Sequence, residues 1–222
     1  MQAGNAYYRK TADLPAIVPV FPLSAALLLP GGRMPLNIFE PRYLQMVDAV
    51  MAGTRLIGMI QPDLGGAMRE DGEPELCQVG CIGRITSLSE TGDGRYLIAL
   101  HGVCRFRIAE EVAVRTPFRQ CRIVPFAGDL DERGAEEIDR PALLRAFRAY
   151  LEANGLDADW ESVSRAENAT LVNALSMMAP YGPAEKQALL EAPDLKTRAE
   201  TLIAITEMAM ARDRDDFGPG LQ

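Results

Sequence analysis

The sequence has a single histidine and four cysteines, and their spacing does not suit a metal site or a thiol enzyme. Cys77 and Cys81 are separated by three residues instead of the two of a common zinc knuckle, and no second close pair exists. Cys104 and His101 would point to opposite faces of one strand, so they cannot act as nucleophile and base. We therefore expect the cysteines to pack as small hydrophobic side chains, with no metal and no cofactor.

The sequence also lacks a nucleotide-binding loop and a membrane-spanning run. No Gly-x-x-x-x-Gly-Lys-Ser/Thr pattern occurs, and the chain has only three lysines. Residues 14–30 are mostly apolar, but prolines interrupt them and no signal-peptide cleavage site follows. No other stretch approaches the roughly 18 apolar residues that a membrane helix needs. We expect a cytoplasmic protein that does not hydrolyse ATP.

The chain lacks the concentrated positive charge of a nucleic-acid-binding protein. Its net charge is -8; residues 1–126 hold 13 basic and 12 acidic side chains, whereas residues 127–222 hold 10 and 19. An acidic second half repels phosphate groups, and the first half is close to neutral. Nucleic acid is therefore not an expected partner.

Prolines are abundant near the N-terminus and determine the local structure there. Each proline fixes its own φ, removes an N–H donor and disfavours helix in the residue before it, so residues 15–36 should form two short apolar strands joined by a glycine turn. Pro41 suits the first position of a helix, and Gly53 suits its end. The sequence predicts a helix over residues 41–52.

Alternating polar and apolar residues predict further strands up to residue 126. The hairpin signal is clearest where a Gly-Asp-Gly turn separates two alternating runs. The predicted strands span residues 55–61, 77–88, 96–108, 111–114 and 118–126. Residues 62–75 should form an exposed loop, and Arg84, Arg105 and Arg107 should lie on a solvated sheet face, with an acidic-partner patch as the alternative.

After an acidic stretch, the pattern becomes helical. The predicted organisation is a flexible tail (1–14), a β-rich subdomain (15–126), an acidic linker (127–140), a helical bundle (141–212) and a second flexible tail (213–222). Gly155 should end the first helix of the bundle. Ser164 and Glu167 form a capping-box pattern for a second helix through Met178, Pro183 should begin a third, and Asp194 should cap the last.

Several of these segments resemble one known family. Residues 35–43, Pro-Leu-Asn-Ile-Phe-Glu-Pro-Arg-Tyr, are similar to the signature of the N-terminal substrate-binding domain of ATP-dependent Lon proteases. Residues 79–85, 96–108 and 117–119 fit the same family in order, and the resemblance covers about residues 17–212. It implies an α+β fold, with a PUA-like β-barrel or sheet followed by a small helical bundle. Asn37 departs from the family, which often has histidine there.

The resemblance implies a function in protein quality control without catalysis. The nucleotide-binding motif of the family's ATPase does not occur in this sequence, and nothing around Ser176 and Lys186 resembles the family's Ser-Lys dyad. The expected activity is recognition of exposed hydrophobic segments of unfolded or damaged polypeptides, as an adaptor or interaction domain, with an ATP-dependent protease as a further partner. A proline-rich edge cannot complete its own ladder, so we expect the contact residues to be Leu28, Met34, Leu36, Phe39 and Tyr43.

Simple energetics favour weak binding and leave two alternatives. Three buried apolar side chains contribute about 1.5–3 kcal/mol each, and association costs at least about 4, so affinities should be millimolar to micromolar. The alternatives are an enzyme with a small-ligand pocket between the two halves, and an RNA-binding protein by analogy with other PUA-like folds.

Glu40, before Pro41, should bind the helix N-terminus or pair with Arg42.

Overall fold

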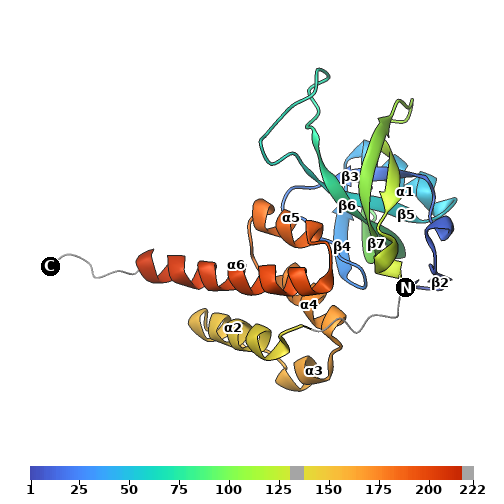
Figure 1. Cartoon of the computed structure of the whole chain (residues 1–222). Coiled ribbons are helices and arrows are strands. Elements are labelled where there is room, and N and C mark those ends of the chain that lie inside the picture. The colour runs from blue at the N-terminus through green and yellow to red at the C-terminus, as the bar shows by residue number, and fades with distance from the viewer. Residues whose placement is uncertain (131–137, 217–222) are drawn as a thin grey trace.

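A computed structural model describes residues 1–130 and 138–216 and shows a β-barrel half beside a helical half (Figure 1). The α+β class and the order of the two halves agree with the sequence prediction. Of the predicted linker, residues 127–130 form a 3-10 helix, η2 (Ala127–Leu130), and residues 131–137 lie outside the described residues. Of the predicted C-terminal tail, residues 217–222 also lie outside them, and residues 213–216 continue a helix.

Six strands form one mixed sheet that closes into a barrel. They are β3 (Ile17–Pro22), β4 (Arg33–Ile38), β5 (Leu56–Pro62), β6 (Leu76–Glu90), β7 (Tyr96–Val112) and β8 (Gln120–Pro125). The order is β4-β7-β6-β5-β3-β8, and β7 also pairs with β8. β7 can pair with both β4 and β8 because its first half pairs with β4 and its second half with β8. β3 and β4 do not pair with each other, although they are neighbours in the sequence.

Both faces of the central strands are buried. One core fills the barrel and contains Val20, Ile82 and Phe106, whereas the other lies between the sheet and the helices and contains Cys81 and Ile85. The middle of β6, residues 79–83, is consequently buried on both sides, whereas Gln78 and most of residues 86–90 are exposed. The strand is therefore not half-buried by alternation as expected, because the helical half covers the face opposite the barrel core.

Residues 1–14, expected to form a flexible tail, instead cover one end of the barrel. They form β1 (Gln2–Ala3), β2 (Ala6–Tyr7) and the 3-10 helix η1 (Thr11–Asp13). Ala3, Tyr8 and Leu14 are buried in the barrel core. Arg84 donates to the hydroxyl of Tyr8 and to Oδ1 of Asn5, both at 3.2 Å. The segment is ordered because it removes the apolar end of the barrel from water.

Six α-helices occur in the described residues: α1 (Pro41–Met51), α2 (Arg140–Ala153), α3 (Trp160–Arg165), α4 (Asn168–Met178), α5 (Pro183–Glu191) and α6 (Leu195–Asp216). The helix starts at Pro41 and Pro183 are confirmed, and Asp194 accepts the N–H of Thr197 at 2.7 Å as a cap. The capping-box prediction is wrong, because Ser164 lies inside α3. Met178, the last residue of α4, is 77% exposed.

Arg105 joins the two halves, although the sequence suggested a solvated side chain. It is 3% exposed and forms a two-pronged ion pair with Asp129 of η2, with Nη2 to Oδ1 at 2.8 Å and Nε to Oδ2 at 2.9 Å. The same guanidinium donates to the carbonyl oxygens of Leu190 at 3.1 Å and of Ala192, at the end of α5. The expectation failed because its partners lie far away in sequence.

The connection between β3 and β4, residues 23–32, is held by side chains of the helical half. Nδ2 of Asn173 donates to the carbonyl oxygen of Pro30 at 3.0 Å, and Nζ of Lys186 donates to that of Ala25 at 2.9 Å. A Cβ at position 32 would overlap with Sδ of Met177, so any larger residue there would displace the end of this side chain. β4 therefore starts from a fixed point.

Candidate functional site

The structure separates the five predicted contact residues into two groups. Leu28 is 1% exposed and Tyr43 is 6% exposed, so neither can contact a partner as the fold stands. The ring of Tyr43 packs edge-on against Phe21, with centroids 4.2 Å apart. Met34 and Leu36 are half-buried against the same core. Phe39 is 61% exposed, because it follows the last residue of β4 and precedes α1.

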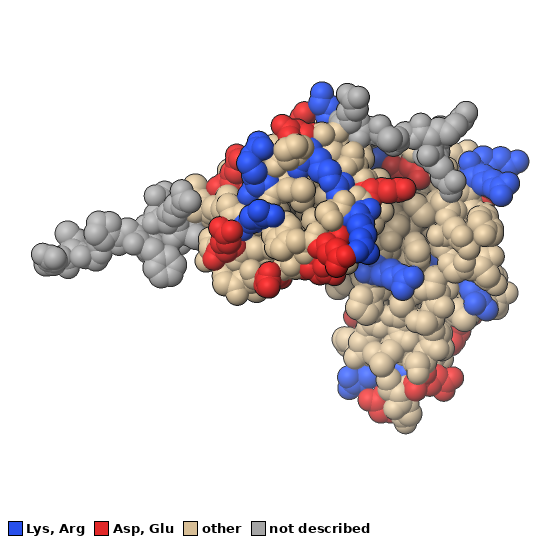
Figure 2. Space-filling view, turned by 90° about the horizontal axis from the view of Figure 1, so that it is seen from below, with Lys and Arg blue, Asp and Glu red and all other residues tan. Residues whose placement is uncertain are grey.

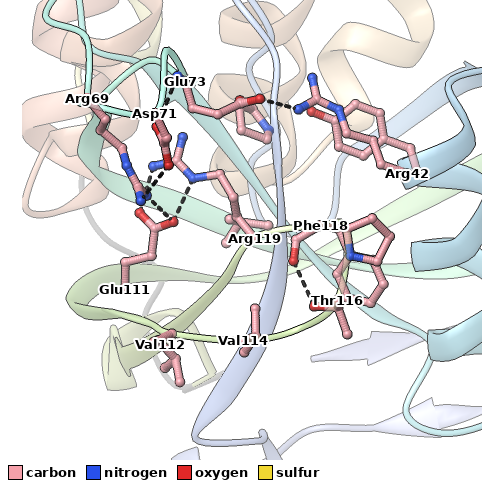
Figure 3. A pocket seen from close by; sticks show the side chains of 15 residues that line it. Arg42, Arg69, Asp71, Glu73, Glu111, Val112, Val114, Thr116, Phe118 and Arg119 are labelled. Atoms are coloured by element: carbon pink, nitrogen blue, oxygen red, sulfur yellow. Dashed lines mark hydrogen bonds and ion pairs between the residues drawn. The ribbon is translucent and has the colours of Figure 1, made fainter.

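A cavity of about 250 Å³ lies beside Tyr43, where three segments meet against Val20 and Pro22 of β3. The segments are the start of α1, the loop between β5 and β6, and the turn between β7 and β8. The loop, drawn in teal, projects from the barrel in Figure 1. Charged side chains on the lining are Arg42, Arg69, Asp71, Glu73, Glu111 and Arg119. Figure 3 shows that they face one another in pairs, with Val112 and Val114 along the turn.

Ion pairs tie the loop to the barrel. Glu111 of β7 sits between two guanidinium groups: it lies 2.5 Å from Nη1 of Arg69 and 2.7 Å from Nη2 of Arg119. Arg119 also donates to the carbonyl oxygen of Pro74 at 2.6 Å. Its hydrogen bonds to Glu111, aided by those from Arg69, hold the pKa of the Glu111 carboxyl below its ordinary value. The sequence did not reveal this network, since its members are distant along the chain.

Arg42 connects the same loop to the start of α1. Its Nη1 lies 2.6 Å from Oε1 of Glu73, and its Nε lies 3.0 Å from Oε2 of Glu40. Of the two roles expected for Glu40, the pair with Arg42 is observed, and its side chain does not cap the helix. The guanidinium also stacks 4.7 Å from the ring centroid of Tyr43, whose pKa is raised by burial. Equal numbers of cations and carboxylates thus surround the cavity.

Exposed apolar side chains occur on each of the three segments that the ion pairs connect. Phe39 precedes α1, Leu64 and Met68 lie on the loop with 48% and 60% exposure, and Val114 lies on the turn with 40%. Apolar side chains exposed singly are normal on a protein surface, whereas a contiguous apolar patch is typical of a protein-interaction surface. We refer to Met34, Leu36 and Phe39 as the β4 surface, because they follow one another along this strand and its exit.

Burial shifts the pKa values of the cysteines and of the single histidine. All four cysteines are free and buried, and burial raises the pKa of Cys104 to about 12 and that of Cys121 to about 11. Burial, with Arg33 nearby, lowers the pKa of His101. Among the side chains that the structure describes, which extend to residue 211 with a gap at 131–137, no three His, Cys, Asp or Glu gather as metal ligands.

A second cavity, of about 290 Å³, lies within the helical half. It is lined by the connection between α4 and α5 and by Ile205, Met208 and Ala209 of α6. Neither of these two cavities lies between the two halves, where the alternative of a small-ligand enzyme would place its pocket. Seen from below, acidic and basic side chains are interspersed over the helical half (Figure 2). Of the helices described, none is long and apolar enough to cross a membrane.

The sequence matches one protein-family model over most of its length. The model is that of the ATP-dependent protease La (LON) substrate-binding domain, and the match covers residues 17–207. Lon protease 2 of Myxococcus xanthus is 25% identical over 203 residues, which are 87% of this chain and 24% of that protein. Lon protease of Desulfosudis oleivorans is 32% identical over 97 residues, covering 44% of this chain and 12% of that protein. The chain thus spans about a quarter or less of these relatives.

Solved structures show the same fold. A Lon N-terminal domain protein from Xanthomonas campestris aligns with a TM-score of 0.62 at 23% identity, covering 85% of this chain and 97% of that one. The N-terminal domain of the Mycobacterium avium complex Lon protease aligns with a TM-score of 0.63 at 18% identity, covering 86% and 98%. Together with the match to the family model, these results show that the chain belongs to the Lon substrate-binding domain family.

Proposed function

We propose that this protein is a non-catalytic module that binds exposed hydrophobic segments of unfolded or damaged polypeptides. Membership of a family named for substrate binding supports a binding role. The observation that carries the proposal is the 61% exposure of Phe39. An aromatic side chain of this size exposes apolar area that a partner can cover.

The position of Phe39 makes it a suitable anchor. Ile38 before it is buried, and Pro41 after it begins α1, so the backbone on both sides is fixed. Met34 and Leu36 add partly exposed apolar area along the preceding strand. Leu28 and Tyr43 support this surface from the core instead of contacting the client. A preorganised apolar surface limits the entropy that is lost on binding.

Replacing Phe39 with alanine should weaken binding to an unfolded client by about five- to twenty-fold. Full burial of a phenylalanine contributes about 1.5–3 kcal/mol, and the exposed 61% of this side chain is the part that a partner can newly cover. A tenfold change in Kd corresponds to about 1.4 kcal/mol. Titration of a reduced, alkylated client, followed by NMR shifts or fluorescence anisotropy, measures the change.

Val124→Ala is a matched control for this variant. Val124 is 58% exposed but lies on β8, outside the β4 surface, so its truncation should leave Kd unchanged. The proposal fails if Phe39→Ala binds as tightly as the wild type, or if the wild type binds no client at high micromolar concentration. A metabolite that raises the melting temperature specifically would instead favour an enzyme.

We propose further that the module acts as an adaptor that presents clients to an ATP-dependent protease. The names of the curated relatives support this association with proteolysis. Its free cysteines suit the reducing cytoplasm, where we place it. Adding the protein to a purified Lon protease should speed degradation of an unfolded client, and Phe39→Ala should remove that effect.

A further inference from the structure

β4 lies at an open edge of the sheet. Among the described strands, β7 is the only one that pairs with it, over residues 33–38. The side chains of Arg33, Pro35 and Asn37 are exposed, and those of Met34 and Leu36 are half-buried. An edge strand of this kind leaves a row of main-chain groups free to pair with another chain.

The hydrogen bonds at the start of β4 establish which residues turn their main chain outward. The N–H of Gly102 donates to the carbonyl oxygen of Gly32 at 2.8 Å, and the N–H of Gly31 donates to that of Gly102 at 2.9 Å. Bonded and non-bonded residues alternate along an antiparallel pair. Positions 34, 36 and 38 therefore bond to β7, and positions 33, 35 and 37 face away from it.

Pro35 supports this assignment independently. Proline has no N–H and cannot donate to a ladder, so it is tolerated in an edge strand where its nitrogen faces away from the neighbour. The outward edge therefore offers N–H groups from Arg33 and Asn37 and carbonyl groups from all three outward positions. No side chain is recorded as bonding to these groups within the described residues.

We propose that the client binds as an additional β-strand along the outer edge of β4. This inference rests on the function proposed above and specifies how the same surface recognises its substrate class. Main-chain pairing is independent of the client's sequence, and alternate apolar side chains of the client then lie beside Met34 and Leu36. The occupant is therefore an extended polypeptide with apolar residues at every second position.

Pro35 weakens this pairing and favours transient clients over a second copy of the protein. One donor is missing from the middle of the edge, so the opposing carbonyl is left without a partner. Proline in an edge strand is a known means of limiting edge-to-edge association. Replacing Pro35 with alanine restores this donor on the side that faces solvent, and it should tighten client binding by about two- to tenfold.

The test compares two changes that act on main-chain pairing alone. The first is Pro35→Ala, with melting temperature as the fold control. The second is a client peptide of alternating apolar residues whose five central nitrogens are methylated, which removes donors on both of its edges while keeping its side chains. We expect tighter binding with Pro35→Ala, and at least a tenfold loss with the methylated peptide, by NMR titration at equal concentrations.

Each outcome is decisive. If the methylated peptide binds as well as the unmodified one while Phe39→Ala still weakens binding, strand addition is wrong and the proposed function stands. If neither peptide binds the wild type, both proposals fail. If Pro35→Ala forms a dimer in sedimentation experiments without binding the client more tightly, the edge pairs with a second copy and the chosen occupant is wrong. Should Pro35→Ala not fold, the methylated peptide still decides the question on the wild type.

Discussion

Replacing Arg105 with methionine should lower the free energy of unfolding by about 3–5 kcal/mol, because it leaves one member of a buried ion pair without its partner. Asp129 would keep the backbone N–H of residue 105, at 2.8 Å, but would lose both prongs of the guanidinium. The carbonyl groups of Leu190 and Ala192 would lose their donor as well. The total free energy of unfolding of a typical domain is only about 5–15 kcal/mol.

A second variant separates the charge from the packing. Arg105→Met combined with Asp129→Leu removes both charges, so it should lose less stability than Arg105→Met alone, since replacing a whole buried pair by apolar residues is often nearly neutral. If the two residues do not interact, the double variant instead loses the sum of the single losses.

Urea unfolding followed by two signals tests how the halves are coupled. Trp160, the single tryptophan, lies in α3 and reports the helical half by fluorescence, whereas far-UV circular dichroism reports the whole chain. We expect coincident transitions in the wild type, and an earlier fluorescence transition in Arg105→Met, because the contact with α5 is lost. A loss below about 1 kcal/mol with coincident transitions would falsify the assigned role of Arg105.

Two further predictions concern titratable groups. The pKa values of Cys104 and Cys121 are about 12 and about 11, so at pH 8 only about one thiol in a thousand or fewer is ionised to thiolate. A disulfide reagent should therefore label them only after unfolding, and fast labelling of the native protein would contradict their burial. Because the pKa of Glu111 is below its ordinary 4.5, its ion pairs stabilise the fold above that pH and are lost as pH falls through the folded-state pKa. Amide hydrogen exchange in residues 63–75, corrected for its intrinsic pH dependence, should therefore become faster on acidification. In Glu111→Gln, exchange in this loop should be faster already at pH 7. Equal exchange rates in the wild type and in this variant would refute the role of the ion pairs in holding the loop.

The sequence was informative wherever structure is determined locally. Pro41 and Pro183 begin helices because the ring fixes a helical φ and removes a donor that has no partner there. The turn around Gly92 and Gly94 joins β6 and β7 because both glycines adopt positive φ. The α+β class followed from these signals and from the change of pattern after residue 126.

Non-local pairing could not be read in the same way. Alternation placed Arg105 on the face opposite Phe106, which is correct, but it gave no sign that α5 and η2 cover that face. For the same reason residues 1–14 looked unpatterned, although Ala3 and Tyr8 complete the barrel core. Register and coverage depend on partners that are distant in sequence, and a single chain does not encode them in a local pattern.

The candidate surface was partly predictable. The proline-rich segment indicated an edge strand, and Phe39 is exposed beside it. The same reasoning could not separate Phe39 from Tyr43, because both are aromatic and four residues apart. What separates them is the helix: Tyr43 lies on the inner face of α1 against Phe21, whereas Phe39 precedes the helix. The loop between β5 and β6, which is ion-paired to Glu111, gave no indication of this network in its sequence beyond its acidic composition.

The contacts of the helical half with residues 23–32 order the start of β4, and this order affects how strongly the edge of β4 could bind another chain. Asn173 and Lys186 immobilise the carbonyl groups just upstream, and Met177 closes the space beneath Gly32. The strand to which we propose that a client binds is therefore already ordered, and under that proposal the entropic cost of docking falls on the client alone. Under the same proposal, the stiffness of an unfolded segment would determine whether it binds or dissociates, without rearrangement of the strand that receives it.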